Sequence, residues 1–346
     1  MKEYDFGLSW SVKSKEFFIN ALKQASQKRD LSFLWIYDNN VRDIIKRLER
    51  ADLKIKFLLD TEATYNKERD PYARVCYAVK DNGGVIVNDP DRTRIAVDKS
   101  VMHYELVNAG ITTPYSVIVR NWEPNTFKLT EEEKKNLGLP YMIKPACGYA
   151  REGVIETDKF SIREIARARK FDRGDNFLLQ ERINPIDLGG KRAWFRVFHV
   201  FDTIIPCWWN DRTGYYKHVS EEEFIAYCLS PLTKITAKIA DIAPLVWFST
   251  EIAIDQKADQ PRFVVIDYVN DQCDMTVQSE DETGVPDNIA EFTANCMINA
   301  AHHLITNKEI DKEYTVWFRN AKKVQLRGLG DAPEPLIPTK EGEDGS

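Results

Sequence analysis

The sequence lacks long apolar runs and clustered cysteine or histidine motifs. No run of 18 apolar residues occurs in its 346 residues, so we expect no membrane span. The first ten residues, MKEYDFGLSW, contain no apolar h-region, so a cleaved signal peptide is not expected. The six cysteines lie far apart, without CxxC or Cys/His ligand spacing, which argues against a zinc site or a disulfide framework. These absences predict a cytoplasmic protein with reduced thiols.

An excess of positive charge is also lacking. Lys and Arg number 48 against 54 Asp and Glu, for a net charge of −6, which excludes a broad nucleic-acid footprint but leaves room for a local cationic pocket. We find no Ser/His/Asp or Cys/His arrangement typical of nucleophilic catalysis. With 43% hydrophobic and 29% charged residues, the composition is that of a globular protein of two or three domains. A homodimer is compatible with this composition.

Strand and helix patterns divide the chain into segments. Strands alternate with amphipathic helices over residues 1–90, which predicts a small parallel α/β unit. Residues 91–110, DRTRIAVDKSVMHYELVNAG, predict one helix that closes at Gly110. The apolar runs at 192–201 and 203–209 predict a hairpin around Asp202. Further helices are expected at 232–242 and 286–304, and the Pro-, Gly- and acid-rich tail at 328–346 is expected to be disordered.

The segment TEIAIDQKADQPRFVVIDYVN, residues 250–270, predicts a β-hairpin because two apolar runs flank a polar connector. If the register centres on Asp259, Glu251 lies opposite Asp267, with Cβ atoms about 5 Å apart. Like charges so placed repel, unless a divalent cation lies between them. Asn270 adds a neutral oxygen ligand of the kind Mg²⁺ accepts. The alternative is two acids on a solvated strand face.

Two lysines are candidates for binding an anion. Lys144 lies inside the apolar run YMIKPA, where a buried ammonium needs a compensating anion or a shifted pKa. A phosphate would supply that anion, and an edge-strand lysine that snorkels to water is the alternative. Lys99, in the predicted helix, is on its own typical of a solvated helix lysine.

Other residues carry weaker signals. Gly148 and Gly153 bracket a short polar turn that would let the backbone approach an anion, although a plain hairpin turn explains them nearly as well. Gln180 and Glu181 end the apolar run FLLQERI, where backbone groups could pair with a purine edge. Arg196 shares one strand face with two neighbours, by the period-2 rule. The neighbours on that face are Arg192 and Trp194, and the alternative is an exposed basic strand face. The aromatic segment that follows could line an acceptor pocket or form an edge of the core; it contains Arg212, Lys217 and His218.

The order of these motifs resembles the ATP-grasp superfamily from about residue 85 to about residue 275. The matching segments are NDPDRTRIAVDKSVMHYELVNAGITTP, LGLPYMIKPACGYAREGV, FLLQERI, FRVFHVFDTIIPCWW, TEIAID and FVVIDYVND. Within this superfamily, the sequence is similar to the carboxylate–amine ligases of the glutamate ligase and D-alanine–D-alanine ligase type. The resemblance implies an α/β (α+β) fold, in which a Rossmann-like pre-ATP-grasp unit precedes a two-lobed ATP-grasp fold with mostly antiparallel sheets. The implied divisions are 1–90 for the first unit, 91–178 for the N-terminal lobe, 179–327 for the C-terminal lobe and 328–346 for the tail.

The resemblance also implies roles for individual residues. Lys99 and Lys144 match the lysines that contact the nucleotide phosphates, and Arg196 matches the arginine near the γ-phosphate and acyl phosphate. The implied ligands of Mg²⁺, with Mn²⁺ as an alternative, are Glu251, Asp267 and Asn270. The phosphate loop is matched by the segment with Gly148, Tyr149 and Gly153. The hinge that contacts adenine is matched by Gln180, Glu181 and Ile183, and the ribose contact by Asp187. Substrate contacts are expected at the end of the first strand, at Trp10, Ser11 and Ser14.

Two features differ from the family pattern. The loop CGYAREGV has fewer glycines than the family loop, and Asp267 and Asn270 stand three residues apart instead of two. On a regular strand, that spacing points the two side chains to opposite faces. A β-bulge near Tyr268 would restore convergence; otherwise Asp271 substitutes for Asn270, or one ligand is lost.

We therefore expect an ATP- and Mg²⁺-dependent ligase that activates a substrate carboxylate as an acyl phosphate and joins it to an amine. The expected partners are small-molecule carboxylates and amines, such as amino acids or peptide-like substrates, and neither nucleic acid nor membrane. One alternative is a small-molecule kinase on the same scaffold, which would transfer the γ-phosphoryl group to a hydroxyl. A second alternative is a non-catalytic ATP-binding protein, favoured by the glycine-poor loop and the irregular spacing.

Overall fold

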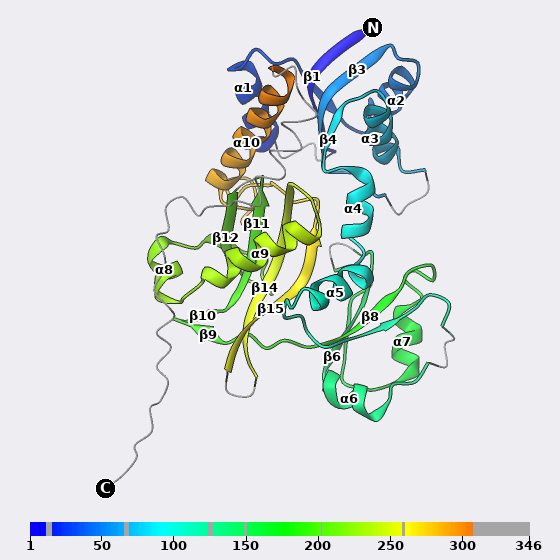
Figure 1. Cartoon of the computed structure of the whole chain (residues 1–346), viewed down its shortest axis with the longest axis vertical. Helices are drawn as coiled ribbons and strands as arrows, with labels where there is room; N and C mark the ends of the chain where they lie inside the picture. Colours follow the sequence, from blue (N-terminus) through cyan, green and yellow to red (C-terminus); the bar gives the residue numbers. More distant parts are fainter. Residues whose placement is uncertain are drawn as a thin grey trace.

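The computed structural model describes residues 1–11, 16–65, 69–123, 127–148, 151–201, 203–257 and 260–306. Figure 1 shows three parts: an N-terminal α/β unit at the top, a large lobe below it on the left and a small lobe on the right. No helix in the described ranges is long and apolar enough to cross a membrane. The predicted disordered tail and the turn residue Asp202 lie outside the described residues.

The N-terminal unit is built on a parallel sheet with strand order β2-β1-β3-β4. Its elements are β1 (Lys2–Ser9), α1 (Phe17–Gln27), β2 (Phe33–Ile36), α2 (Val41–Glu49), β3 (Leu53–Asp60), α3 (Pro71–Asp81) and β4 (Val85–Val87). Apolar residues of α1 share one core cluster with the sheet, and those of α2 and α3 share another, so helices cover both faces. The last helix, α10 (Asp287–Thr306), returns to this unit and packs beside α1 (Figure 1).

The predicted single helix over residues 91–110 is wrong, because two helices occupy this segment. These are α4 (Pro90–Ala96) and α5 (Lys99–Asn108). Asp98 separates them, since its carboxylate accepts hydrogen bonds from the backbone N–H groups of Ser100 and Val101 and caps α5. This cap places Lys99 at the first position of α5, and Gly110, with φ of 72°, follows its end.

The small lobe contains an antiparallel sheet with strand order β5-β8-β6-β7. Its elements are β5 (Ser116–Val119), α6 (Glu131–Leu137), β6 (Tyr141–Pro145), β7 (Ile155–Thr157), α7 (Ile162–Ala168) and β8 (Phe177–Glu181). One sheet face packs on α6 and α7 through a cluster that includes Leu137, Tyr141, Ile165 and Phe177. Because β6 lies between β8 and β7, it is an inner strand.

The large lobe contains a five-stranded antiparallel sheet with strand order β13-β12-β11-β14-β15. Its elements are β11 (Trp194–Val200), β12 (Thr203–Trp209), β13 (Tyr216–His218), α8 (Glu221–Ala226), α9 (Ser230–Ile242), β14 (Trp247–Lys257) and β15 (Gln260–Asn270). A two-stranded ribbon of β9 (Asp187–Leu188) and β10 (Lys191–Arg192) precedes them. The structure therefore confirms the predicted hairpins, in which Val200 pairs with Thr203 and Lys257 with Gln260.

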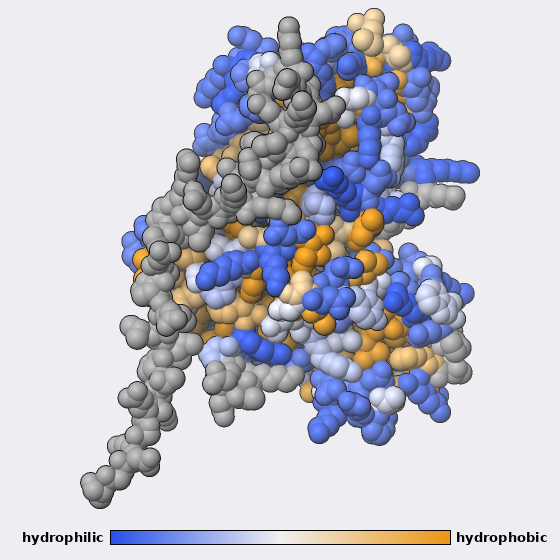
Figure 2. All heavy atoms as spheres, in the orientation of Figure 1, coloured by the Kyte–Doolittle hydropathy of each residue, from blue (hydrophilic) through white to orange (hydrophobic). Residues whose placement is uncertain are grey.

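Hydrophilic residues cover most of the outer surface in the view of Figure 2, and hydrophobic residues are exposed near its centre. Large apolar side chains on α4 and α5 remain exposed, among them Ile95, Tyr104 and Val107. The opposite face of α5 is buried, with Met102 and Leu106 in the core between the lobes. The buried face of α5 thus fixes its N-terminal end, which carries Lys99, where the two lobes meet.

Candidate functional site

Two adjoining cavities lie between the lobes. The first, of about 300 Å³, is lined mainly by the small lobe and by β10, β11, β14 and β15. The second, of about 730 Å³, lies between the large lobe, the phosphate-loop segment and residues 63–65 of the N-terminal unit. Five residues line both cavities: Lys99, Gly148, Arg151, Glu251 and Asp267. We call these five residues the junction.

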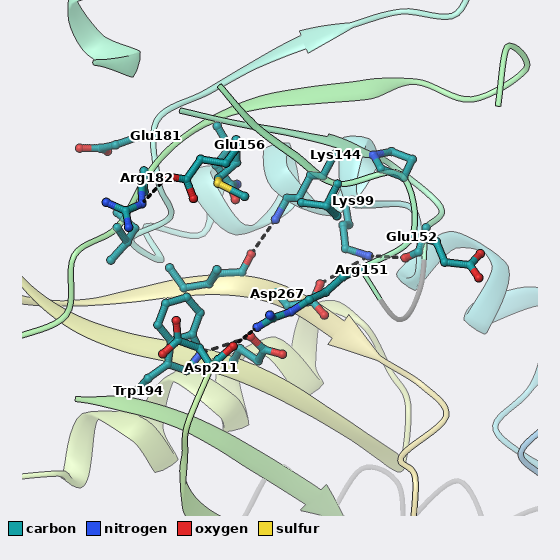
Figure 3. A pocket seen from close by; sticks show the side chains of 18 of the residues that line it. Lys99, Lys144, Arg151, Glu152, Glu156, Glu181, Arg182, Trp194, Asp211 and Asp267 are labelled. Carbon is teal, nitrogen blue, oxygen red and sulfur yellow. Dashed lines mark hydrogen bonds and ion pairs between the residues drawn. The ribbon is translucent and has the colours of Figure 1, made fainter. Parts of the chain in front are cut away.

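Lys99 is not the solvated helix lysine that its sequence context favours. Its side chain is only 13% exposed, and its Nζ donates to the carbonyl oxygen of Gly148 at 3.1 Å. The same Nζ lies 3.4 Å from Oδ1 of Asp267. Figure 3 shows Lys99 and Lys144 pointing from the small-lobe side toward the strand that carries Asp267. A helix residue and a strand residue from different lobes therefore meet at the junction.

Lys144 is buried on an inner strand, so the alternative of an edge-strand lysine that snorkels to water is wrong. It is 9% exposed, and its Nζ donates to the carbonyl oxygen of Ile266 at 2.9 Å. Burial lowers the pKa of Lys144 to about 8, a shift that the Asp267 carboxylate opposes and the neighbouring Lys99 reinforces. Lys144 lines the first cavity, where an anionic ligand would stabilise its charge.

The three predicted metal ligands converge. Glu251 pairs directly with Asp267, as the hairpin register predicted, and Asn270 pairs with Ser249. The register shifts on either side of the Glu251–Asp267 pair, so the expected bulge near Tyr268 is present. Glu251, Asp267 and Asn270 all line the second cavity. Asp271 lines it too, so both sequence alternatives for the third ligand lie at this wall.

The donor set and its charges fit a hard divalent cation. Oδ1 of Asp267 is buried, and its partner among the described residues is Nζ of Lys99 at 3.4 Å; this long contact leaves the oxygen able to ligate a metal ion as well. Burial acts to raise the pKa of Asp267, but Lys99, Lys144 and Arg196 outweigh it and hold the pKa below its usual value. Within the described ranges no three His, Cys, Asp or Glu side chains form a metal-binding group; one of the three candidate ligands, Asn270, is a carboxamide.

Arg192, Trp194 and Arg196 lie on one face of their segment in the large lobe, as the alternation of residues predicted. Arg192, Trp194 and Arg196 are half-buried on one side, while Ala193 and Phe195 are buried in the core. Arg196 forms an ion pair with Glu251, and Nε1 of Trp194 donates to the other oxygen of that carboxylate at 3.2 Å. Nε of Arg196 is buried and finds no hydrogen-bond partner in the described part of the chain, so one donor remains for a ligand.

Arg192 forms an ion pair with Asp211 of the same lobe. Its Nε and terminal nitrogen lie 3.0 and 3.2 Å from the two carboxylate oxygens of Asp211. Such a bidentate pair holds both side chains in one geometry. Arg192 and Asp211 both line the first cavity and form a fixed part of its wall.

The predicted hinge residues line the first cavity: Gln180, Glu181 and Ile183. Gln180 is buried, and its Nε2 donates to Oγ of Ser116 and to the hydroxyl of Tyr268, both at 3.1 Å. The structure does not bring Asp187 to these residues. It lies exposed in β9, where its carboxylate accepts the backbone N–H of Gly190 at 2.8 Å.

In the predicted phosphate loop, Tyr149 lies outside the described residues. Gly148 lines both cavities, and an added Cβ there would lie 2.4 Å from Cγ of Pro145, so only glycine fits. Gly153 has φ of 73°, and its added Cβ would lie 2.7 Å from the Phe171 ring. Sequence reasoning missed Arg151, although a cation between two glycines was a usable signal.

The acceptor side differs from the expectation. Trp10 is buried in the core, and the hydroxyl of Ser11 donates a hydrogen bond to Glu62 at 2.8 Å. Neither residue is among the described residues that line the two cavities. Ser14 lies outside the described residues. Thr64 and Tyr65 line the second cavity instead. From the aromatic segment, Trp209, Gly214 and Tyr216 line that cavity, whereas Arg212, Lys217 and His218 are exposed.

No protein-family model and no curated protein matches this sequence, but solved structures do. The chain is similar to D-alanine–D-alanine ligase from Bacillus anthracis in complex with ATP, with a TM-score of 0.58 and 16% identity over 88% of this chain and 98% of that one. It is also similar to a RimK-domain ATP-grasp protein from Sphaerobacter thermophilus (TM-score 0.55, 15% identity, 85% and 98% covered). The ATP-grasp ligase PsnB, in complex with its minimal precursor, Mg and ADP, gives a TM-score of 0.55 at 11% identity, with 86% and 99% covered.

These likenesses identify the class of fold: the chain has the ATP-grasp fold, as the motif order predicted. The agreement spans 85–88% of this chain.

Proposed function

We propose that the protein is an ATP-dependent ligase that joins a substrate carboxylate to an amine. The observation that carries the proposal is the junction, where Lys99 and Arg151 lie with the carboxylates of Glu251 and Asp267 between the two cavities. Lys144 lines the first cavity beside it, and Arg196, paired with Glu251, lines the second. The first cavity takes the nucleotide, and the second takes the carboxylate and the amine. Residues 1–90 form a Rossmann-like pre-ATP-grasp unit, and 91–178 form most of the N-terminal lobe. The expected boundary at 178/179 divides β8, whose strand continues in the small-lobe sheet to Glu181. The C-terminal lobe follows, and α10 returns from it to the first unit.

The nucleotide lies between the lobes, with its base against the hinge. Gln180, Glu181 and Ile183 line the first cavity and hold adenine through backbone groups. Lys99 and Lys144 bind phosphate oxygens. The lowered pKa of Lys144 supports this role, because a phosphate restores the stabilisation of charge that burial removes.

Glu251, Asp267 and Asn270 are the residues that would hold Mg²⁺. The ion supplies neutralisation of the charge that develops on the phosphate oxygens. Two carboxylates and a carboxamide are the hard oxygen ligands that Mg²⁺ prefers, and the buried Oδ1 of Asp267, whose contact with Lys99 is a long one of 3.4 Å, supports the assignment. Both PsnB, solved with Mg and ADP, and the ligase solved with ATP share this fold.

The reaction divides into two transfers. A carboxylate oxygen of the substrate attacks the γ-phosphorus of ATP, the bond to the β,γ-bridging oxygen breaks, and ADP leaves with an acyl phosphate remaining. The amine then attacks the acyl carbon, loses a proton and releases phosphate. Arg196 orients the phosphoryl group and the acyl phosphate, and the walls of the second cavity exclude water. Positioning and electrostatic stabilisation, without a covalent enzyme intermediate, account for catalysis.

The test is a screen for release of ADP and phosphate from ATP against amino acids, dipeptides and small carboxylates. With an active substrate pair, EDTA should abolish turnover, and Asp267→Asn should lower kcat by about 100-fold or more because it removes charge from the metal site. Asp241→Asn, an exposed carboxylate on α9, is the matched control. Undiminished Mg²⁺-dependent turnover in Asp267→Asn would contradict the proposed site, and a phosphorylated product without an amide would contradict the ligase reaction.

A further inference from the structure

Arg151 spans the boundary between the lobes. It belongs to the phosphate-loop segment of the small lobe, and its terminal nitrogen donates to the backbone carbonyl oxygen of Asp211 in the large lobe. Its guanidinium carbon lies 5.5 Å from the centroid of the Trp209 ring. Figure 3 shows its side chain extending toward Asp211. Because Arg151 lines both cavities, its charge lies where nucleotide and second substrate would meet.

Trp209 contacts a second arginine as well. The guanidinium carbon of Arg196 lies 4.9 Å from the same ring centroid, so one indole supports two cations, one from each lobe. Aromatic rings attract guanidinium groups and hold them in a planar, stacked geometry. Two cations that share a ring repel each other unless an anion binds beside them. Trp209 is thus a platform that orients charge toward the junction.

The two arginines differ in how their charge is used. Arg196 forms an ion pair with Glu251, and Lys99 pairs with Asp267. Arg151 forms no ion pair with any carboxylate that the structure describes within 4.0 Å, and its charge meets only a carbonyl dipole and the Trp209 ring. Among the junction residues, Arg151 is therefore the cation whose charge stays available to a ligand.

The position of Arg151 selects the terminal phosphoryl group over the inner phosphates. Lys144 lines the first cavity only, on the nucleotide side, whereas Arg151 lines both cavities together with Glu251 and Asp267. Under the proposed function, the acceptor carboxylate in the second cavity must reach the phosphorus that is transferred, so the γ-phosphoryl group lies on the side of the nucleotide that faces this cavity. A cation at the junction then faces the γ-phosphoryl group, which carries the most charge and is the one transferred.

On the basis of the proposed function, we propose that Arg151 binds the γ-phosphoryl group of ATP and that Trp209 is the positioning residue that holds its guanidinium at the junction. Arg151 supplies through its side chain what a loop with more glycines would supply through backbone N–H groups. The backbone φ of 61° at Arg151 is a conformation that disfavours most L-residues and would suit glycine. An arginine at this position is consistent with a role for the side chain itself.

The test compares two nucleotides by isothermal titration calorimetry on the full chain with magnesium chloride present. The probes are ADP, which lacks the γ-phosphoryl group, and the non-hydrolysable ATP analogue AMP-PNP, which carries an equivalent one. Arg151→Ala should weaken AMP-PNP binding by about 10- to 100-fold, because a charge-assisted hydrogen-bonded contact is lost. ADP affinity should stay within about threefold of wild type.

Three further variants separate charge from geometry. Arg151→Lys keeps the charge without the planar group and should weaken AMP-PNP binding to an intermediate degree. Trp209→Leu removes the platform and should weaken AMP-PNP more than ADP, whereas Trp209→Phe should restore most of the difference. Arg163→Ala removes an exposed arginine on α7 and should change neither affinity.

The outcomes distinguish this inference from the proposed function. If wild type binds both nucleotides and Arg151→Ala weakens both equally, or neither, the assignment of Arg151 is overturned while the nucleotide site stands. If wild type binds neither nucleotide, the proposed function itself fails. Arg151 is exposed, so its replacement should leave the fold intact, and an unchanged circular dichroism spectrum and melting temperature would verify this.

Discussion

A buried histidine behind the nucleotide cavity should make folding stability sensitive to pH. His103 on α5 is 8% exposed, and its Nδ1 lies 2.8 Å from the hydroxyl of Tyr268. That hydroxyl also accepts a hydrogen bond from Gln180. Burial, with a smaller contribution from the charge of Lys144, lowers the pKa of His103 to about 4 from its ordinary 6.5.

The sign of the effect follows from which state binds more protons. Between pH 6.5 and pH 4, His103 in the unfolded chain takes up a proton while the folded protein keeps it neutral. Stability contributed by neutral His103 is therefore complete above pH 6.5 and is lost as pH falls. From these two pKa values, the loss between pH 7 and pH 5 is about 2 kcal/mol.

Other groups titrate in the same range, so the test must be a difference. Burial raises the pKa of Asp60 to about 6 and that of Asp271 to about 7. A carboxyl with a raised folded pKa stabilises the protein as pH falls, which opposes the effect of His103. The total pH dependence of the wild type is therefore not diagnostic.

His103→Gln removes the titrating group and keeps a polar side chain for Tyr268. Urea unfolding of both proteins at pH 7 and pH 5 should show the wild type losing about 2 kcal/mol relative to the variant. In NMR spectra, one of the five histidine signals, absent from the variant, should stay unprotonated down to pH 5. A stability difference that does not change with pH, or a signal that titrates near 6.5, would refute the reasoning.

Two further substitutions test the packing and capping described above. Gly84→Ala should destabilise the N-terminal unit by about 1–3 kcal/mol, because the added Cβ would lie 2.4 Å from the backbone oxygen of Ile55 and 2.5 Å from Val79. Urea unfolding measures this loss, and the control variant Gly174→Ala should leave the free energy of unfolding nearly unchanged. Thr130→Ala should cost about 1 kcal/mol, since it breaks the capping box with Glu133 at the start of α6, and Thr130→Ser should retain most of that stability; equal stability of the two variants would contradict the capping role.

Local sequence patterns predicted most of the elements. Period-2 alternation located β11, and the polar connector between apolar runs located the β14–β15 hairpin, because both signals depend only on neighbouring residues. The same local reading failed at residues 91–110, where helical periodicity continues through Asp98. Asp98 instead caps α5 through its side chain, and capping competes with helix continuation whenever an aspartate can reach the next N–H groups.

The environment of each lysine could not be predicted, because it depends on contacts between distant segments. Lys99 gains its partners from Gly148 and Asp267, and Lys144 gains its partner from Ile266, 122 residues away. A sequence pattern indicates that Lys144 sits in an apolar run but not which group approaches it across the cleft. The contacts of Arg151 were hidden for the same reason, since Trp209 and Asp211 lie in the other lobe.

Asn270 shows how an irregular strand can build a site that a regular one could not. Glu251 pairs with Asp267, but its neighbour Ile252 pairs with Val265, so Ile266 is an extra residue on β15. A second extra residue follows, because Ser249 pairs with Asn270 across an interval of two residues on β14 and three on β15. The second bulge corrects the parity and brings Asn270 to the cavity that Glu251 and Asp267 line.

The first bulge has a consequence of its own. The carbonyl oxygen of the extra residue, Ile266, accepts the hydrogen bond from Nζ of Lys144 at 2.9 Å. A bulged residue is left unpaired in the ladder, so its carbonyl is available to a side chain from the other lobe. The two irregularities on either side of Asp267 therefore act together: one presents a carbonyl to the buried lysine, and the other completes the oxygen set. The three-residue spacing between Asp267 and Asn270, which contradicts the family pattern on a regular strand, is what the second bulge requires.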